Sequence, residues 1–390
     1  MFEICEQDFG GSRLSGRVVA SPGYLGIPLR LALCDNGEDE KEVIMRIMTA
    51  IACSAFALFG MSAATPMQDA KAQSSSSFES YLQEVRQKAL QQGVRAQTLD
   101  QVLPGLTYNP RVIQLDQSQP GGSTNSAIPP FAPYQQRHIT SQRIANGKAA
   151  YRRLIAKLID VERETGVPGP IIMAIYGKET NYGSYMGDFD IPRSLATLAY
   201  EGRRRSLFEP ELLAVLQLID KGVPQSALKG SWAGAMGMPQ FLPSVYLRLA
   251  KDGSGDGYAD IWNSEYDAVA SIANYFVNSG WRRGEPWGIA VNVPSSLDRD
   301  AVASKIVPTR CPRVFGRHSQ WKSMAEWRSL GVVPATGKIL GKNVMATLLE
   351  PDGAGSTAYL LTGNYRVILD YNCSNFYGLA VGLLADEIRS

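Results

Sequence analysis

Glu179 is the side chain whose type and position best fit acid–base chemistry. Four residues follow one another at i, i+3, i+4 and i+7 and would share one face of a helix: Ile172, Ile175, Tyr176 and Glu179. Burial on that apolar face would raise the pKa of the carboxyl group, and the negative end of the helix dipole would act in the same direction. A carboxyl that keeps its proton near neutral pH can act as a general acid. The alternative is a structural glutamate that turns inward and pairs with an arginine.

Other catalytic chemistries have little support in the sequence. Among its 390 residues there are only two histidines, His138 and His318, which argues against most zinc hydrolases. The patterns G-x-S-x-G, G-x-x-x-x-G-K-[ST] and H-E-x-x-H do not occur. With 45% hydrophobic and 19% charged residues, the composition is that of a folded globular protein rather than a disordered or fibrous one. An enzyme with this sequence would rely on carboxylates.

The N-terminal part predicts export. An apolar run follows Arg46, and small residues then lead to Ala70-Lys71-Ala72, an A-x-A cleavage pattern. We expect residues 45–72 to be a signal peptide that directs the protein to the periplasm, with no transmembrane segment in the mature form; a buried core helix is the alternative. Residues 1–44 extend no pattern, and we expect them to be a mis-annotated N-terminal extension before a start at Met45.

The chain after residue 72 has 33 Lys and Arg against 28 Asp and Glu. This mild positive charge favours binding to anionic polymers such as the cell wall.

The residue patterns predict an α+β fold that is mainly α-helical. Helices are expected at 78–103 with a break near Gly93, and at 141–165, 170–180, 209–221, 265–280 and 376–388. Residues 104–136 are rich in Pro and Gly and are expected to be loop-like, as a linker or an ordered strap. The region 281–370 mixes short apolar runs with Gly and Pro, and 365–369 is strand-like.

Four motifs stand in order along the chain: GKETNYG at 177–183, SWAGAMGMPQFLPSVY at 231–246, DGSGDGYADIW at 252–262 and VILDYNCSNFYGLAVGLLAD at 367–386. In these motifs the sequence resembles the soluble and membrane-bound lytic murein transglycosylases of the B type, over about residues 78–388. One departure is Met238-Pro239, where members often have an aromatic residue and a glycine. The resemblance implies a lysozyme-like fold and an enzyme that cleaves the MurNAc–GlcNAc bond of peptidoglycan, leaving a 1,6-anhydromuramoyl end without consuming water. Implied partners are the glycan strands and other cell-wall enzymes, not nucleic acid.

By this resemblance, Glu179 is the catalytic glutamate. It would protonate the leaving oxygen and then take the proton of the C6 hydroxyl as that oxygen attacks C1. The N-acetyl carbonyl of the substrate would relieve the positive charge, so that no second catalytic carboxylate is needed, unlike in the usual glycosidase pair. Two alternatives remain: a hydrolytic muramidase, in which water replaces the C6 hydroxyl, and a non-catalytic peptidoglycan-binding scaffold.

The resemblance also points to residues that line the sugar-binding cleft. Ser231 would hold the N-acetyl group, and Gln240 and Phe241 would contact sugars, in a stretch whose small residues let the backbone approach a ligand. Tyrosine rings stack on sugars while their hydroxyls form hydrogen bonds. The other candidates from the family match are Tyr134, Arg204, Arg205, Tyr275, Tyr371, Asn372 and Tyr377. Without the resemblance, a tight helix-packing turn and core or rim tyrosines are the structural alternatives.

Residues 252–260 have the spacing of a calcium-binding loop. Oxygen donors stand at positions 1, 3, 5 and 9 with Gly at position 6, whereas position 12 is Asn263 in place of the usual glutamate. We expect a structural Ca²⁺ or Na⁺ at this EF-hand-like loop, and no cofactor for the chemistry. The expected ligands are Asp252, Ser254, Asp256 and Tyr258. Glu265 or Asp267 would complete the site, and the resemblance favours Asp267. A solvated acidic turn is the alternative.

The cysteines and the composition suggest how the mature chain is organised. Two cysteines, Cys311 and Cys373, remain after residue 72, and in an oxidising compartment such a pair predicts a disulfide, with two separate buried thiols as the alternative. Three parts are expected: an N-terminal helical segment with a Pro/Gly-rich strap at 73–136, the lysozyme-like catalytic core with the EF-hand-like loop at 137–290, and a C-terminal α/β subdomain that completes the cleft at 291–390.

Overall fold

The computed structural model describes residues 67–119 and 128–389. The expected extension at 1–44 and most of the expected signal peptide at 45–72 lie outside the described residues. Residues 67–72 belong to helix α2 (Met67–Gln91). No helix within the described ranges has both the length and the apolar character needed to cross a membrane.

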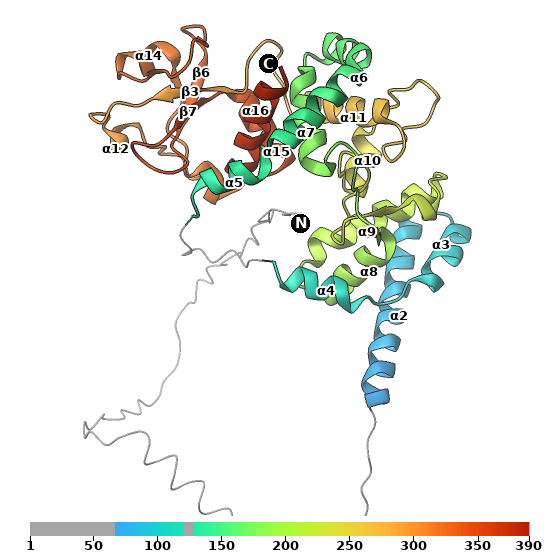
Figure 1. The fold of residues 1–390 in the computed structure, drawn as a ribbon. Helices are drawn as coiled ribbons and strands as arrows, with labels where there is room; N and C mark the ends of the chain where they lie inside the picture. The colour runs from blue at the N-terminus through green and yellow to red at the C-terminus, as the bar shows by residue number, and fades with distance from the viewer. Residues whose placement is uncertain (1–66, 120–127, 390) are drawn as a thin grey trace, which may run out of the picture. The chain divides into compact units, whose positions relative to one another are not determined.

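The first helical group is built around the pair α8 (Ile191–Glu201) and α9 (Arg205–Asp220), which pack along each other (Figure 1). The predicted break near Gly93 is confirmed, because α2 ends at Gln91 and Gly93 has a left-handed backbone with φ of 86°. Helix α3 (Ala96–Val102) and the short 3₁₀ helix η1 (Leu103–Gly105) follow. Helix α3 packs on α9, and the apolar side chains of these helices share one core, which includes Val85, Leu99, Leu195 and Leu212.

The prediction that residues 104–136 are loop-like is wrong in two places. Helices α4 (Pro110–Gln117) and α5 (Phe131–His138) lie in this segment. Asn109 caps α4 by accepting a hydrogen bond from the backbone N–H of Arg111, and Pro110 takes the first helical position, where a missing N–H carries no penalty. Pro110, one of the prolines that suggested a loop, therefore marks the start of a helix.

The second helical group surrounds α7 (Gly169–Thr180). Helices α6 (Ser141–Thr165), α11 (Glu265–Asn278) and α16 (Asn375–Arg389) pack directly against α7, and α15 (Gly363–Tyr371) packs on α16 (Figure 1). Helix α6 ends where predicted, since Gly166 takes a left-handed conformation with φ of 76°. Ile172, Met173 and Ile175 are fully buried, so α7 is enclosed on several faces and not only along one stripe.

The C-terminal region contains an antiparallel five-stranded sheet in the order β4-β6-β7-β3-β5. Its strands are β3 (Gly288–Asn292), β4 (Lys322–Ser323), β5 (Val333–Pro334), β6 (Met345–Leu349) and β7 (Ala358–Leu361). A separate small sheet pairs β1 (Phe189–Asp190) with β2 (Lys229–Gly230). The remaining short helices are η2 (Gln225–Ala227), α10 (Pro243–Leu249), α12 (Arg299–Val302), α13 (Pro312–Phe315) and α14 (Met324–Ser329). The expected mainly helical α+β class is confirmed.

The prediction that residues 365–369 are strand-like is wrong, because they form part of α15. Thr362 caps this helix by accepting a hydrogen bond from Asn364 N–H. Tyr365, Ile368 and Leu369 are buried and stand at i, i+3 and i+4, a helical spacing. A short apolar run of this length does not by itself distinguish a strand from a buried helix.

Candidate active site

Glu179 lies in the last turn of α7, immediately before an unusual turn. Asn181 and Tyr182 both have left-handed backbones, with φ of 49° and 59°. Such conformations are uncommon outside glycine and often occur at functional sites. The Thr180 side chain fixes the turn, since its hydroxyl donates to the Met238 carbonyl at 3.1 Å and accepts from Gly183 N–H at 3.1 Å. The end of the buried helix thus presents Glu179 in a defined position.

The carboxyl group of Glu179 is partly buried and bonded to a tyrosine. The Tyr377 hydroxyl on α16 donates to Glu179 Oε1 at 2.5 Å. Burial raises the pKa of Glu179, while the Tyr377 hydrogen bond and the Lys178 ammonium lower it by less. Among the described residues Tyr377, and no arginine, is the partner of this carboxyl. The structure therefore does not support the alternative of a structural glutamate paired with an arginine. The environment of Glu179 suits a general acid.

Aromatic residues from two helices and the 231–241 loop gather near Glu179. The rings of Tyr275 and Tyr371 have centroids 4.7 Å apart, and Phe241 lies 5.9 and 6.1 Å from them. Tyr275 and Tyr371 pack against the cores of both helical groups, so this aromatic cluster lies where the two cores meet. Burial, followed by the negative charge of Glu179, raises the pKa of Tyr371 and Tyr377 well above that of a free tyrosine. Both hydroxyls therefore remain protonated donors.

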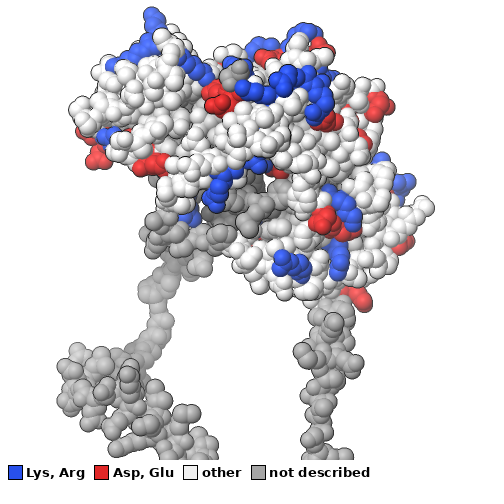
Figure 2. All heavy atoms as spheres, viewed as in Figure 1, with Lys and Arg blue, Asp and Glu red and all other residues white. Residues whose placement is uncertain are grey.

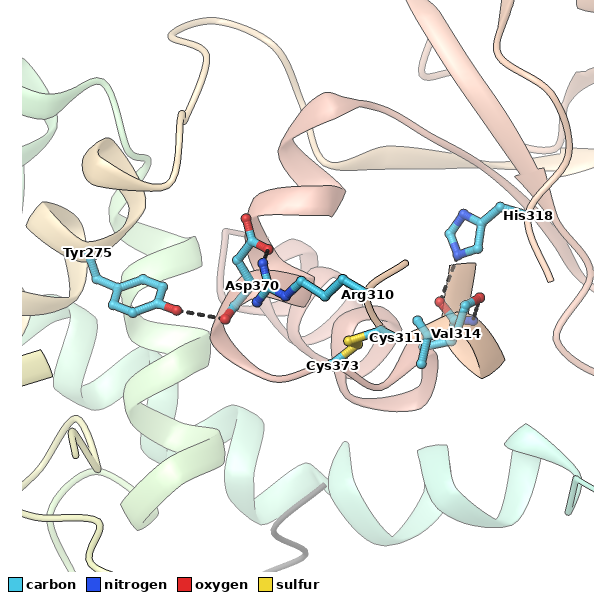
Figure 3. Close-up of a disulfide and its surroundings, with 8 residues drawn as sticks. Tyr275, Arg310, Cys311, Val314, His318, Asp370 and Cys373 are labelled. Atoms are coloured by element: carbon cyan, nitrogen blue, oxygen red, sulfur yellow. Dashed lines mark hydrogen bonds and ion pairs between the residues drawn. A yellow bond between two sulfur atoms is a disulfide. The ribbon is translucent and has the colours of Figure 1, made fainter. Parts of the chain in front are cut away.

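The hydroxyls of this cluster contact backbone carbonyls. Tyr371 donates to the Pro239 carbonyl at 2.5 Å. Tyr275 donates to the Asp370 carbonyl at 2.6 Å (Figure 3). Tyr134 lies on α5, where its ring centroid is 4.1 Å from that of His138. Tyr275 and Tyr371 are thus held by hydrogen bonds to backbone carbonyls near the site, whereas Tyr134 lies on a separate helix, α5.

The 231–241 segment is a compact loop. Ser231 is buried, and its hydroxyl accepts from Ala235 N–H at 2.9 Å. Gln240 has a left-handed backbone, and its Nε2 donates to the carbonyls of Met186 at 3.1 Å and Gly237 at 2.9 Å. A Cβ added to Gly230 would lie 2.0 Å from the Ala235 carbonyl oxygen. The glycine therefore serves the packing of the loop itself, and the sugar contacts expected of Ser231, Gln240 and Phe241 stay predictions.

Arg204 and Arg205 are bonded within the chain. Arg204, together with Arg203, pairs with the buried carboxylate of Asp116 on α4. Arg205 donates to the carbonyls of Ala199 at 2.9 Å and Tyr200 at 3.1 Å, near the C-terminal end of α8. These contacts hold α4, α8 and α9 together. The expected contact of both arginines with substrate carboxylates stays a prediction.

Asn372 has an unused acceptor. Its Oδ1 is buried and has no hydrogen-bond partner among the described residues. Asn372 directly follows Tyr371 at the end of α15. An unpaired buried acceptor is unfavourable unless a ligand or water supplies a donor. Of the predicted substrate-binding residues, Asn372 has the clearest free capacity for a substrate N–H or O–H.

The disulfide fixes the segment that follows the aromatic cluster. Cys311 and Cys373 are bonded to each other, which joins the start of α13 to the α15–α16 junction (Figure 3). Beside it, Arg310 pairs with the Asp370 carboxylate. His318 is buried, with its Nε2 2.8 Å from Asn375 Oδ1. This junction carries Tyr371 and leads into the helix of Tyr377.

The EF-hand-like loop is closed by its own backbone. Asp267 is fully buried, and its carboxylate accepts backbone N–H groups of Gly253, Ser254 and Asp260 at 2.7–2.9 Å. Asp252 accepts from Gly255 and Gly257, and these bonds lower its pKa. Within the described ranges, no three His, Cys, Asp or Glu side chains are gathered closely enough to hold a metal ion. The oxygen-only donor set of the loop nevertheless fits Ca²⁺ better than a transition metal.

Comparison with known proteins decides the family. Residues 77–386 match the family described as the transglycosylase SLT domain. The chain belongs to this family. The match covers nearly all of the described residues and includes α7, the 231–241 loop and most of α16. Together with the relatives described next, it confirms the function expected from the sequence, a lytic transglycosylase of peptidoglycan, and the expected enzyme class.

Three relatives show how far the likeness of this transglycosylase extends. Membrane-bound lytic murein transglycosylase B of Escherichia coli K12 is 31% identical over 305 residues, which cover 76% of this chain and 79% of the relative. SltB3 of Pseudomonas aeruginosa, solved with NAG-anhNAM-pentapeptide, is 39% identical with a TM-score of 0.72 over 80% of each chain. Escherichia coli Slt35, solved in complex with calcium, is 30% identical with a TM-score of 0.64 over 79% of this chain and 92% of that chain.

Sequence reasoning missed the contact between two residues of this transglycosylase, Lys178, which directly precedes Glu179, and His138. Lys178 donates to His138 Nδ1 at 3.0 Å and to the Tyr134 hydroxyl at 3.2 Å. Lys178 stands within the GKET motif, which was the available signal. His138 lies 40 positions before Lys178, and nothing in the spacing of the two residues indicates that they meet.

Proposed function

We propose that this transglycosylase cleaves the β-1,4 bond between MurNAc and GlcNAc, with Glu179 acting first as acid and then as base. In the first step the Glu179 carboxyl donates its proton to the bridging oxygen, and the bond from that oxygen to C1 of MurNAc breaks. In the second step the Glu179 carboxylate takes the proton of the C6 hydroxyl while O6 bonds to C1. The products are a GlcNAc end and a 1,6-anhydroMurNAc end, and no water is consumed.

The observation that carries this proposal is the environment of Glu179. The pKa of Glu179 is set by burial, by the hydrogen bond from the Tyr377 hydroxyl and by the charge of the Lys178 ammonium. No second carboxylate of the described residues contributes to this pKa. Burial favours the protonated carboxyl that the first step needs. The Tyr377 hydroxyl can stabilise the carboxylate that exists between the steps. A glycosidase of the usual kind would need a second acid as nucleophile or base.

The relatives support the same product. SltB3 is solved both with NAG-NAM-pentapeptide and with NAG-anhNAM-pentapeptide, and the second ligand carries the anhydro sugar that this mechanism forms. Asn372 Oδ1, buried and without a partner among the described residues, is available for a polar group of the glycan. We place substrate contacts at Asn372, Tyr134, Tyr275, Tyr371 and Tyr377, around Glu179.

Product analysis tests the proposed reaction. Purified sacculi are digested with the enzyme, and the released muropeptides are weighed by mass spectrometry. A transglycosylase yields anhydro ends, each one water lighter than the reducing ends that a hydrolytic muramidase yields. Anhydro products are expected, and reducing products would show that water, not the C6 hydroxyl, attacks C1.

Peptidoglycan as substrate places the site of action in the periplasm. The signal-peptide pattern at 45–72 supports export to that compartment. On the face that Figure 2 draws, basic and acidic side chains are interspersed. We therefore attribute recognition of the glycan to the site around Glu179 rather than to a basic patch.

A structural Ca²⁺ is proposed for the EF-hand-like loop. The calcium complex of Slt35 supports it, as does the set of oxygen donors at Asp252, Ser254, Asp256, Tyr258 and Asp267. The buried Asp267 already joins α11 to the loop through three backbone hydrogen bonds. An ion there would strengthen this connection and would take no part in the reaction.

A further inference from the structure

A lysine stands directly before Glu179, and groups from two other helices enclose its side chain. Lys178 is partly buried. Its Nζ donates to His138 Nδ1 at 3.0 Å and to the Tyr134 hydroxyl at 3.2 Å, both on α5. The same nitrogen lies 5.1 Å from the ring centroid of Tyr134 and 5.5 Å from that of Tyr377 on α16. The ammonium group is therefore fixed between α5 and α16.

This arrangement links Lys178 to the catalytic carboxyl through Tyr377. A cation over an aromatic ring is attracted to the negative face of the ring and helps to hold it in place. The hydroxyl of the same ring donates to Glu179 Oε1 at 2.5 Å. The positive charge of Lys178 also lowers the pKa of the Glu179 carboxyl.

We propose that Lys178 is a positioning residue of the reaction, which orients the Tyr377 hydroxyl on Glu179 and places a fixed positive charge beside the carboxyl without binding the substrate. This inference rests on the proposed role of Glu179. A group that gives up a proton and later takes it back works best when neither of its forms is too stable. Burial favours the protonated form, and Lys178 together with Tyr377 favours the carboxylate. Lys178 thus balances the two steps.

His138 completes the arrangement as a neutral acceptor. Burial and then the nearby Lys178 lower the pKa of His138 to about 4, so the imidazole is uncharged near neutral pH. Because an ammonium group only donates, Nδ1 must be the accepting nitrogen. Arg143 of α6 donates to the His138 carbonyl at 2.9 Å and holds the end of α5. Titratable and charged groups near Lys178 include Tyr134 and His138 of α5, Glu179 of α7 and Tyr377 of α16. Arg137 of α5 and Arg143 of α6 act in turn on His138, and both lower its pKa.

The test measures kcat and KM against pH for Lys178→Met, Lys178→Gln and Lys178→Arg on a soluble glycan fragment. Activity is lost as pH rises through the pKa of Glu179, since the first step needs the protonated carboxyl. Removing the positive charge raises that pKa, so the basic limb of the profile should move up by about 0.5–1 unit in the Met and Gln variants. We expect kcat to fall several-fold, with a smaller change of KM because Lys178 also donates to Tyr134, a proposed substrate contact. Lys178→Arg keeps the charge and should restore the position of the basic limb.

Matched variants separate this role from simple destabilisation. Lys338→Met removes a lysine whose partner is Asp386, 3.4 Å away, and should leave the pH profile unchanged. Circular dichroism checks that each variant is folded. If Lys178→Met does not fold, Lys178→Gln, which keeps a hydrogen-bond donor, replaces it in the test. A basic limb that stays in place in the charge-free variants, or a raised KM with normal kcat, would overturn the inference. If the Lys178 variants keep the wild-type pH profile while Glu179→Gln is inactive, the role of Lys178 is refuted and the proposed function stands. An active Glu179→Gln would refute the proposed function as well.

Discussion

Tyr377→Phe is the change that most directly probes how Glu179 is tuned. The substitution removes the hydroxyl that donates to Glu179 Oε1 at 2.5 Å and keeps the buried ring. A hydrogen bond to a charged group contributes about 1.5–3 kcal/mol. Because about 1.4 kcal/mol corresponds to one pKa unit, its loss should raise the pKa of Glu179 by roughly 1–2 units. The carboxylate between the two steps loses the same stabilisation, so kcat should fall about tenfold or more.

The assay is the pH dependence of kcat on a soluble glycan fragment, from acid to alkaline pH. The basic limb should move to higher pH, because Glu179 keeps its proton further into the alkaline range. Tyr365→Phe is the matched control: the hydroxyl of Tyr365 donates to the Asn375 carbonyl at 2.9 Å, also on α16, so its loss should lower the melting temperature without moving the pH profile. A basic limb of Tyr377→Phe that coincides with the wild type would refute the assigned role of this hydroxyl.

Two further predictions concern stability. Chelation of calcium should lower the melting temperature by several degrees, and Asp267→Asn should abolish this response; equal melting temperatures with chelator and with added calcium would exclude the metal site. Replacing both Cys311 and Cys373 with Ser should reduce the free energy of unfolding by about 4 kcal/mol, the chain-entropy value for a disulfide that closes a loop of 62 residues. Denaturant unfolding measures this, and an unchanged midpoint would show that the bond does not stabilise the fold.

Helices with clear ends could be predicted from the sequence. Gly166 stops α6 at the expected residue, and Pro170 stands in the first turn of α7. Helix α8 was missed although Ile191, Leu195 and Leu198 have helical spacing and all three are buried. Its short length and the loop-like residues before it concealed the pattern. Periodicity therefore worked best where a glycine or proline also marked the boundary.

The candidate site could be predicted only in part. The apolar neighbours of Glu179 at helical spacing correctly predicted its burial. In the structure, however, α7 is buried on several faces, so one apolar stripe is only part of the reason. The partner Tyr377 is 198 positions away, and no spacing in one sequence indicates that such residues meet. Resemblance to a family supplied Tyr377 as a sugar-binding residue. Its hydrogen bond to the carboxyl required the packing of α16 against α7.

The most direct test of the central claim is the activity of Glu179→Gln on purified sacculi, with released muropeptides identified by mass. The amide has nearly the same shape as the carboxyl group but can neither donate the acidic proton nor take it back. Release of anhydro-muropeptides should fall by about 10³-fold or more while the protein stays folded. Release at a rate near that of the wild type would contradict the assignment of Glu179 as the acid and base of the reaction.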